Sequence, residues 1–154
     1  MDIGDLLAPN GVLLRSGASS KRQALHAVAE AASHALGIDE SKIFDALMER
    51  EALGSTGLGS GVAVPHARLK DVPRVSAVFV RLDTPVAYEA VDDRPVDLMF
   101  ALFAPPADGA EHLRALAAVS RALRSPELRE QLRQARTVDA IKALFVKDAP
   151  ATAA

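Results

Sequence analysis

Cysteine is absent from the 154-residue sequence, which excludes a disulfide framework and any zinc site built on thiolates. A strong charge of one sign is also absent, because 18 basic and 20 acidic residues give a formal net charge of −2. This balance offers no electrostatic footprint for nucleic acid or an anionic membrane. No apolar run is long enough to cross a bilayer, and the acidic start Met1–Asp5 lacks the layout of a signal peptide. We therefore expect a cytoplasmic protein without membrane insertion.

The length of 154 residues fits one domain, which can bury a sizeable core without disulfides or bound metal. Short apolar runs alternate along the chain with longer stretches of helical periodicity, and no internal repeat interrupts them. The helical stretches are numerous enough to cover both faces of one sheet. We therefore predict an α/β fold: a three-layer α/β/α single domain with a mixed sheet of about four or five strands flanked by helices.

Strands are predicted where apolar and β-branched residues cluster between turn residues. The predicted strands are Val12–Leu14, Val62–Val64, Val75–Leu82 and Leu98–Ala104. The last of these is apolar at every position, as expected of a central strand that is covered on both faces. A turn is predicted at Thr84–Pro85, after which Val86–Tyr88 would pair back along the chain.

Helix starts are predicted from residues whose side chains can accept hydrogen bonds from the first backbone N–H groups. The predicted N-caps are Ser20, Asp39, Asp108, Ser125 and Thr137. Ser20 with Gln23, and Asp108 with Glu111, also have the spacing of a capping box. The helix after Asp108 is expected to carry His112 in its first turn. Its predicted core face consists of Leu113, Leu116, Ala117, Ser120 and Leu123.

The stretch Gly54–His66 contains four of the nine glycines within eight residues, followed by a short β-branched run and a proline directly before histidine. Such dense glycine lets the backbone fold tightly, and its free N–H groups can form a concave anion site. Val62–Val64 reads as a short strand that delivers His66 beside this loop. A histidine next to an anion-binding loop suggests phosphoryl chemistry.

Three familiar glycine motifs do not fit this stretch. A P-loop needs a lysine after its second glycine, where Ser60 stands instead. The dinucleotide-binding fingerprint needs a third glycine, at a place that Val62 and Val64 occupy in its two registers. A nucleophile elbow needs a glycine where Leu53 and Leu58 stand.

Arg50, the run from Gly54 to Gly59 and the end Val64–His66 together resemble the active-site signature of fructose/mannitol-type enzyme IIA proteins. This family belongs to the bacterial phosphoenolpyruvate-dependent phosphotransferase system. The stretches Asp97–Pro105 and Glu111–Leu113 resemble the same family. The free-standing nitrogen-regulatory branch is the most similar.

The resemblance covers roughly residues 5 to 146. It implies one EIIA type-2 domain over residues 1–147, and residues 148–154 are expected to form a disordered tail.

The resemblance implies that His66 accepts a phosphoryl group on Nε2 from the histidine of an HPr-type phosphocarrier. Imidazole suits this role because it is neutral and nucleophilic near its ordinary pKa of about 6.5. Arg50 would donate to phosphoryl oxygens through its planar fork, and His112 would add a ring donor and a helix N-terminus. The loop is expected to bind the phosphoryl group through Ser55, Thr56, Gly57 and Gly59. No metal and no organic cofactor are implied.

Each of these residues also has a plainer explanation. Arg50 can simply favour a helix C-terminus, His66 can end a strand, and His112 can be an exposed residue at a helix start. The serines of the loop, Ser55 and Ser60, serve solubility nearly as readily as ligand contact. The two other histidines, His26 and His34, lie eight positions apart on one helix and are expected to be ordinary surface residues.

Several functions therefore stay open. In the nitrogen branch, the phosphorylation state would regulate partner proteins; in the sugar branch, the phosphate would pass to a IIB domain for fructose/mannitol-type uptake. We favour the regulatory role from the closer resemblance. An interaction module without phosphotransfer, and a hydrolase with His66 as its base, are the remaining alternatives. The hydrolase ranks last because no nucleophile or acidic orienting residue stands near the loop in the sequence.

Overall fold

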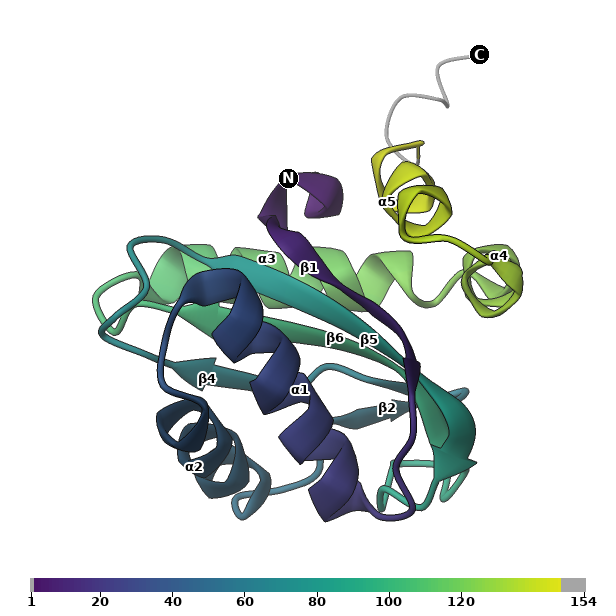
Figure 1. Ribbon diagram of the computed structural model, residues 1–154, viewed down its shortest axis with the longest axis horizontal. Helices are drawn as coiled ribbons and strands as arrows, with labels where there is room; N and C mark the ends of the chain where they lie inside the picture. Colours follow the sequence, from purple (N-terminus) through teal and green to yellow (C-terminus); the bar gives the residue numbers. More distant parts are fainter. Residues whose placement is uncertain (1, 148–154) are drawn as a thin grey trace.

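The computed structural model describes residues 2–147 (Figure 1). One mixed sheet has the strand order β1-β5-β6-β3-β2, and β4 also pairs with β6. The strands are β1 Leu7–Ser16, β2 Gly57–Gly59, β3 Val62–Ala63, β4 His66–Arg68, β5 Ser76–Val86 and β6 Val96–Ala104. β1 runs parallel to β5, β3 and β4 run parallel to β6, and the remaining pairs are antiparallel.

Helices cover both faces of this sheet (Figure 1). They are η1 Ile3–Leu6, α1 Lys21–Leu36, α2 Glu40–Glu51, α3 Gly109–Ala122, α4 Pro126–Gln134 and α5 Val138–Lys147. The predicted α/β fold with a mixed sheet is therefore confirmed. The sheet has six strands, because three segments of only two or three residues also pair within it. The expected tail at residues 148–154 lies outside the described part of the chain.

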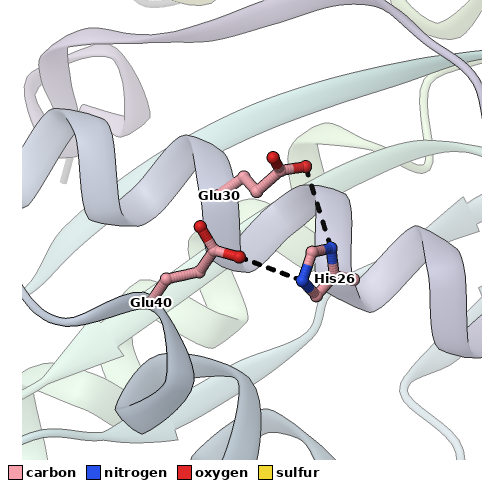
Figure 2. A group of neighbouring side chains, drawn as sticks. All are labelled: His26, Glu30 and Glu40. Carbon is pink, nitrogen blue, oxygen red and sulfur yellow. Dashed lines mark ion pairs between the residues drawn. The ribbon is translucent and has the colours of Figure 1, made fainter.

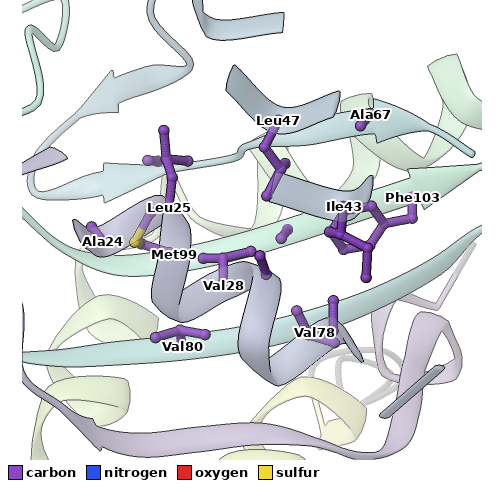
Figure 3. Packing of buried hydrophobic residues seen from close by; sticks show 14 of the residues in the cluster. Ala24, Leu25, Val28, Ile43, Leu47, Ala67, Val78, Val80, Met99 and Phe103 are labelled. Atoms are coloured by element: carbon purple, nitrogen blue, oxygen red, sulfur yellow. The ribbon is translucent and has the colours of Figure 1, made fainter. Parts of the chain in front are cut away.

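The side chains of β6 alternate between two hydrophobic cores, as the period of two along a strand requires. Met99 and Phe103 point to the side of α1 and α2, where they meet Leu25 and Leu47 (Figure 3). The alternate positions point to the side of α3, α4 and α5. There the ring of Phe100 packs edge-on against that of Phe145 on α5, with ring centroids 5.1 Å apart. Both faces of β6 are thus buried, which agrees with its predicted central place.

Four of the five predicted N-caps are confirmed by hydrogen bonds. The side chains of Ser20, Asp39 and Ser125 accept from backbone N–H groups in the first turns of their helices. The hydroxyl of Thr137 accepts from the N–H of Ala140 at 3.1 Å. The starts of these helices are set by neighbouring residues, because each cap accepts from backbone N–H groups that have no acceptor within the helix.

The fifth predicted cap is confirmed in position, since Asp108 is the N-cap residue of α3, but the predicted capping box is not formed. Asp108 makes no side-chain hydrogen bond to α3, and Glu111 pairs with Arg114 at 3.4 Å instead of reaching back. The capping box at Ser20 is also incomplete, because the side-chain Oε1 of Gln23 accepts from the N–H of Ser19 instead of that of the cap itself.

The predicted turn at Thr84–Pro85 was wrong as well. β5 runs through it to Val86, which pairs with Val96 of β6. The register shifts between Arg81 and Val86, so the additional residues of β5 are taken up by an irregularity. A proline is tolerated there because it need not donate to the ladder.

The core face of α3 is rotated relative to the prediction. Leu113 is 68% exposed and Ala117 is exposed, whereas His112, Ala115 and Val119 are buried. Leu123 is buried as predicted and Leu116 packs against the core, but in the first turn His112 takes the inward position that Leu113 was expected to hold. This rotation brings His112 to the site described next. Within residues 2–147, none of the helices has the length and apolar character needed to cross a membrane.

Candidate functional site

His66 opens β4 at the edge of the sheet. Its Cα lies opposite that of Leu102 on β6, and the carbonyl of Pro65 accepts from the N–H of Leu102 at 2.9 Å. β3 and β4 both run parallel to β6, and Val64 and Pro65 separate them. This pairing fixes the level at which the imidazole leaves the backbone. Ala67 turns to the opposite face and is buried in the core with α1 and α2.

Arg50 lies in the last turn of α2, as predicted, and its guanidinium contacts the imidazole of His66. Its Nε donates to His66 Nε2 at 3.1 Å, and its Nη1 donates to the carbonyl of Gly54 at 2.9 Å. Because His66 Nε2 accepts a hydrogen bond, the ring proton is on Nδ1, which donates to the carbonyl of Val64 at 3.0 Å. The imidazole is thereby held as a neutral ring whose Nε2 lone pair is directed toward Arg50.

His112 approaches the same imidazole from α3. The two rings meet edge to face, with centroids 5.4 Å apart and an angle of 79° between their planes. His112 is only 5% exposed, and its Nε2 is buried without a hydrogen-bond partner among the described residues. A buried polar atom without a partner is costly and needs an explanation. A ligand at His66 would provide one.

Both histidines have pKa values below the ordinary value. Burial is the largest cause for His66, and the neighbouring charge of Arg50 lowers its pKa further. The hydrogen bond to Val64 and the carboxylate of Glu51 act in the opposite direction. Burial also lowers the pKa of His112, followed by the proximity of His66 and Arg68. Both rings are therefore favoured in the neutral form near pH 7.

A cavity of about 480 Å³ opens at these side chains. Its lining comes from α2 and the turn that follows it, from β4 and from α3: Ala46, Glu49, Arg50, Leu53, His66, Ala67, Arg68, His112, Leu113 and Leu116. Two leucines of this lining are largely exposed, Leu53 at 83% and Leu113 at 68%. The cavity thus combines a neutral nucleophilic nitrogen, two guanidinium groups and an apolar rim. This arrangement can receive a small anionic group carried by a larger molecule.

The sequence reasoning did not identify Arg68, Leu53 or Leu113 as parts of this cavity. Arg68 could have been found from strand periodicity, because it lies two positions after His66 and therefore on the same face of β4. The two leucines gave no such signal. A leucine is expected in a core, and only the tertiary arrangement leaves these two in solvent.

Two of the predicted loop residues, Ser55 and Thr56, do not line this cavity. The Ser55 hydroxyl donates to the carbonyl of Tyr88 at 3.0 Å, and its oxygen accepts from the N–H of Gly57 at 3.1 Å. The Thr56 hydroxyl donates to the carboxylate of Glu51. Both side chains thus hold the loop in place through other partners.

The predicted glycines, Gly57 and Gly59, do not line the cavity either. A Cβ on Gly57 would lie 2.7 Å from the Cβ of Ala90, so this position requires the absence of a side chain. Gly59 has a φ of 107°, in a region that favours glycine. The dense glycine therefore serves the tight packing of β2 in the described structure.

A separate group of titratable side chains joins α1 to α2 (Figure 2). His26 Nε2 lies 2.9 Å from a carboxylate oxygen of Glu40, and its Nδ1 lies 3.8 Å from one of Glu30. The two carboxylates thus face different nitrogens of the ring. A shared cation would need one nitrogen lone pair to converge with both carboxylates. His26 and His34 are both exposed.

The chain is similar to proteins of known family. Residues 5–148 match the family model described as phosphoenolpyruvate-dependent sugar phosphotransferase system, EIIA 2. A nitrogen regulatory protein from Bradyrhizobium diazoefficiens is 42% identical over 154 residues, which cover 100% of both chains. A fructose-specific EIIA component from Haloferax volcanii is 36% identical over 68% of each chain. Among solved structures, nitrogen regulatory protein IIA-Ntr from Neisseria meningitidis has a TM-score of 0.86 at 31% identity, covering 93% of this chain and 98% of that one.

Proposed function

This chain belongs to the EIIA 2 family of the phosphoenolpyruvate-dependent sugar phosphotransferase system, and from that premise we propose that it carries a phosphoryl group on His66 Nε2. The donor is the phosphohistidine of an HPr-type phosphocarrier. The hydrogen bond that Arg50 Nε donates to His66 Nε2 supports this proposal, because it marks Nε2 as the unprotonated ring nitrogen and places a phosphoryl-binding cation beside it.

The transfer exchanges one nitrogen–phosphorus bond for another. The lone pair of His66 Nε2 forms the new bond to phosphorus, while the electron pair of the old bond returns to the donor imidazole. His66 keeps its Nδ1 proton, and the carbonyl of Val64 stabilises the positive charge that develops on the ring. Such a reaction needs mainly positioning and charge stabilisation.

Two further groups support the transferred phosphoryl group in this proposal. Arg50 redirects its guanidinium from His66 Nε2 to the phosphoryl oxygens, where charge-assisted hydrogen bonds are strongest. His112 donates from Nε2, which has no partner among the described residues. The cavity also contains Arg68, whose cation favours the same anion.

We further propose that the phosphorylation state regulates partner proteins. The nitrogen regulatory relative, which aligns along its whole length, favours this role. A relay of phosphate to a IIB domain for sugar uptake is the second candidate, which the fructose-specific EIIA relative favours. The two roles differ in whether the phosphoryl group is held for recognition or passed on.

The carrier function is tested by intact mass after incubation with phosphoenolpyruvate, enzyme I and an HPr-type phosphocarrier. We expect one acid-labile phosphoryl group on the wild-type protein and none on the folded variant His66→Ala. The matched control is His34→Ala, which removes an exposed histidine of α1 and should label fully. Labelling of His66→Ala would refute the assignment.

The second step separates regulation from relay. The phosphorylated protein is mixed with a purified fructose-type IIB domain, and loss of its label is followed over time. Retention of the phosphoryl group is expected for the regulatory role. Rapid transfer to the IIB domain would favour sugar-branch relay.

A further inference from the structure

A carboxylate lies buried directly beside the proposed phosphoryl site. Glu51 is the last residue of α2 and follows Arg50 in the sequence, yet it is only 9% exposed. Glutamate is rarely buried unless its charge is paired. The proposed transfer chemistry does not use this carboxylate, so its burial needs another explanation.

Donors from three parts of the chain saturate the Glu51 carboxylate. Its Oε1 lies 3.0 Å from the ammonium of Lys21 and accepts from the N–H of Thr56 at 3.1 Å. Its Oε2 accepts from the hydroxyl of Thr56 and, at 3.3 Å, from that of Tyr88. The Lys21 ammonium also lies 4.7 Å from the centroid of the Tyr88 ring. We call Lys21, Glu51, Thr56 and Tyr88 the Glu51 cluster.

Tyr88 acts in this cluster as a neutral donor. Burial raises the pKa of its phenol above the ordinary value, and the charge of Glu51 raises it further. The phenol proton is therefore retained near neutral pH. The cluster holds one anion and one cation, and the negative charge is fully hydrogen-bonded.

Two chains of hydrogen bonds connect the Glu51 cluster to His66. In the first, the carbonyl of Thr56 accepts from the N–H of Val64 at 3.0 Å, and the carbonyl of Val64 accepts from His66 Nδ1. This chain fixes the ring tautomer. The second runs through the loop that ends at Thr56, because Arg50 Nη1 donates to the carbonyl of Gly54 within it.

We propose that Glu51 is a positioning residue for phosphoryl transfer. It fixes the loop between α2 and β2, and the loop in turn fixes the Arg50 guanidinium and the Nδ1–H tautomer of His66. This inference rests on the proposed carrier function. It predicts that Glu51 acts through Arg50 and the tautomer of His66, without touching the phosphoryl group itself.

The test is a double-mutant cycle on the rate of phosphorylation by the phosphocarrier. Glu51→Gln removes the buried charge and leaves Lys21 only the exposed carboxylate of Glu89, at 3.5 Å. We expect it to slow transfer about tenfold, while the final extent of labelling stays complete. In an Arg50→Ala background, the same change should slow transfer by much less than tenfold, because one of the two groups that it positions is gone. A tenfold effect in both backgrounds would overturn the proposal.

Asp45→Asn is the matched control, since it makes the same chemical change at an exposed position of α2. We expect it to transfer at the wild-type rate. If Glu51→Gln does not fold, Tyr88→Phe decides the matter, because it removes one donor and creates no unpaired charge. It should slow transfer about threefold with wild-type backbone spectra, and an unchanged rate would refute the role of the cluster.

A readout without phosphotransfer separates this inference from the proposed function. Nitrogen-15 spectra of the imidazole rings report the tautomer of His66, which we expect to be Nδ1–H in the wild type and mixed in the Glu51 and Tyr88 variants. If the tautomer changes in the variants as expected but the wild-type protein accepts no phosphate, the carrier function alone is refuted. An unaltered tautomer in folded variants would refute the positioning role alone.

Discussion

Replacement of Arg50 by lysine tests the geometry of the site most directly, because lysine keeps the charge and loses the planar fork. In the structure, one guanidinium contacts two acceptors in different directions, His66 Nε2 at 3.1 Å and the carbonyl of Gly54 at 2.9 Å. A single ammonium on a flexible stem cannot reproduce this arrangement. The variant should therefore lose an oriented, charge-assisted hydrogen bond to the transferring phosphoryl group.

A hydrogen bond to a charged group contributes about 1.5 to 3 kcal/mol. If the whole contribution is realised in the transition state, Arg50→Lys slows transfer about 10- to 100-fold, since each 1.4 kcal/mol corresponds to a factor of about ten. The long-range attraction to the phosphocarrier should change little, because the charge remains. We therefore expect the loss in the first-order transfer rate, with the half-saturating concentration of phosphocarrier nearly unchanged.

The assay is rapid-quench phosphorylation at saturating phosphocarrier, with the fold of each variant checked by thermal unfolding. Arg136→Lys is the control, because it makes the same exchange at an exposed position between α4 and α5. Equal transfer rates in Arg50→Lys and the wild type would remove the guanidinium fork from the mechanism. A defect confined to the half-saturating concentration would assign Arg50 to docking instead.

Three further predictions follow from the same geometry. His112→Ala should still accept phosphate but lose it to water several-fold faster, as followed by intact mass; complete loss of labelling in a folded variant would make His112 the nucleophile. Gly57→Ala should destabilise the fold by about 1 to 3 kcal/mol in urea unfolding, because its Cβ would meet Ala90, whereas Gly17→Ala, with open space around it, should not. Because the folded-state pKa values of His66 and His112 are lowered, the unfolded chain binds more protons below about pH 6.5, so stability should fall toward acid. An undiminished pH dependence in His112→Gln would contradict the contribution of His112.

The sequence predicted those parts of the fold that depend on neighbouring residues. The caps at Ser20 and Ser125 and the end of α1 at Gly37 each answer a local demand of the backbone. The face of α3 could not be found in the same way. Its leucines and alanines trace more than one apolar stripe, and the packing against β6 selects the stripe that includes His112.

The candidate site also has parts that local motifs predict and parts that only the folded chain brings together. Arg50, His66 and His112 were predicted together from motifs, and the structure brings their side chains into one cavity. The Glu51 cluster could not be predicted, because Glu51 and Tyr88 are 37 positions apart and meet only in the folded chain. Thr56 shows what motif reasoning could not foresee: a hydroxyl beside glycines suggests a ligand contact, but in the described structure a nearby buried carboxylate accepts from the same donor.

The geometry also decides what kind of signal phosphorylation would give. In the proposed phosphorylated form, His66 Nε2 is bonded to phosphorus and no longer accepts from Arg50 Nε, but the phosphoryl oxygens take over this donor. One acceptor replaces another, and the hydrogen bond from Nδ1–H to the carbonyl of Val64 is unaffected, so the backbone around His66 has little reason to move.

Phosphorylation would instead add about −1.5 to −2 charges beside a rim formed by the exposed side chains of Leu53 and Leu113. A partner that covers this rim with apolar surface would have to remove the new charge from water, which costs several kcal/mol unless the partner supplies a cation. Recognition of the two forms would therefore depend on charge at an apolar surface, with no change of shape required.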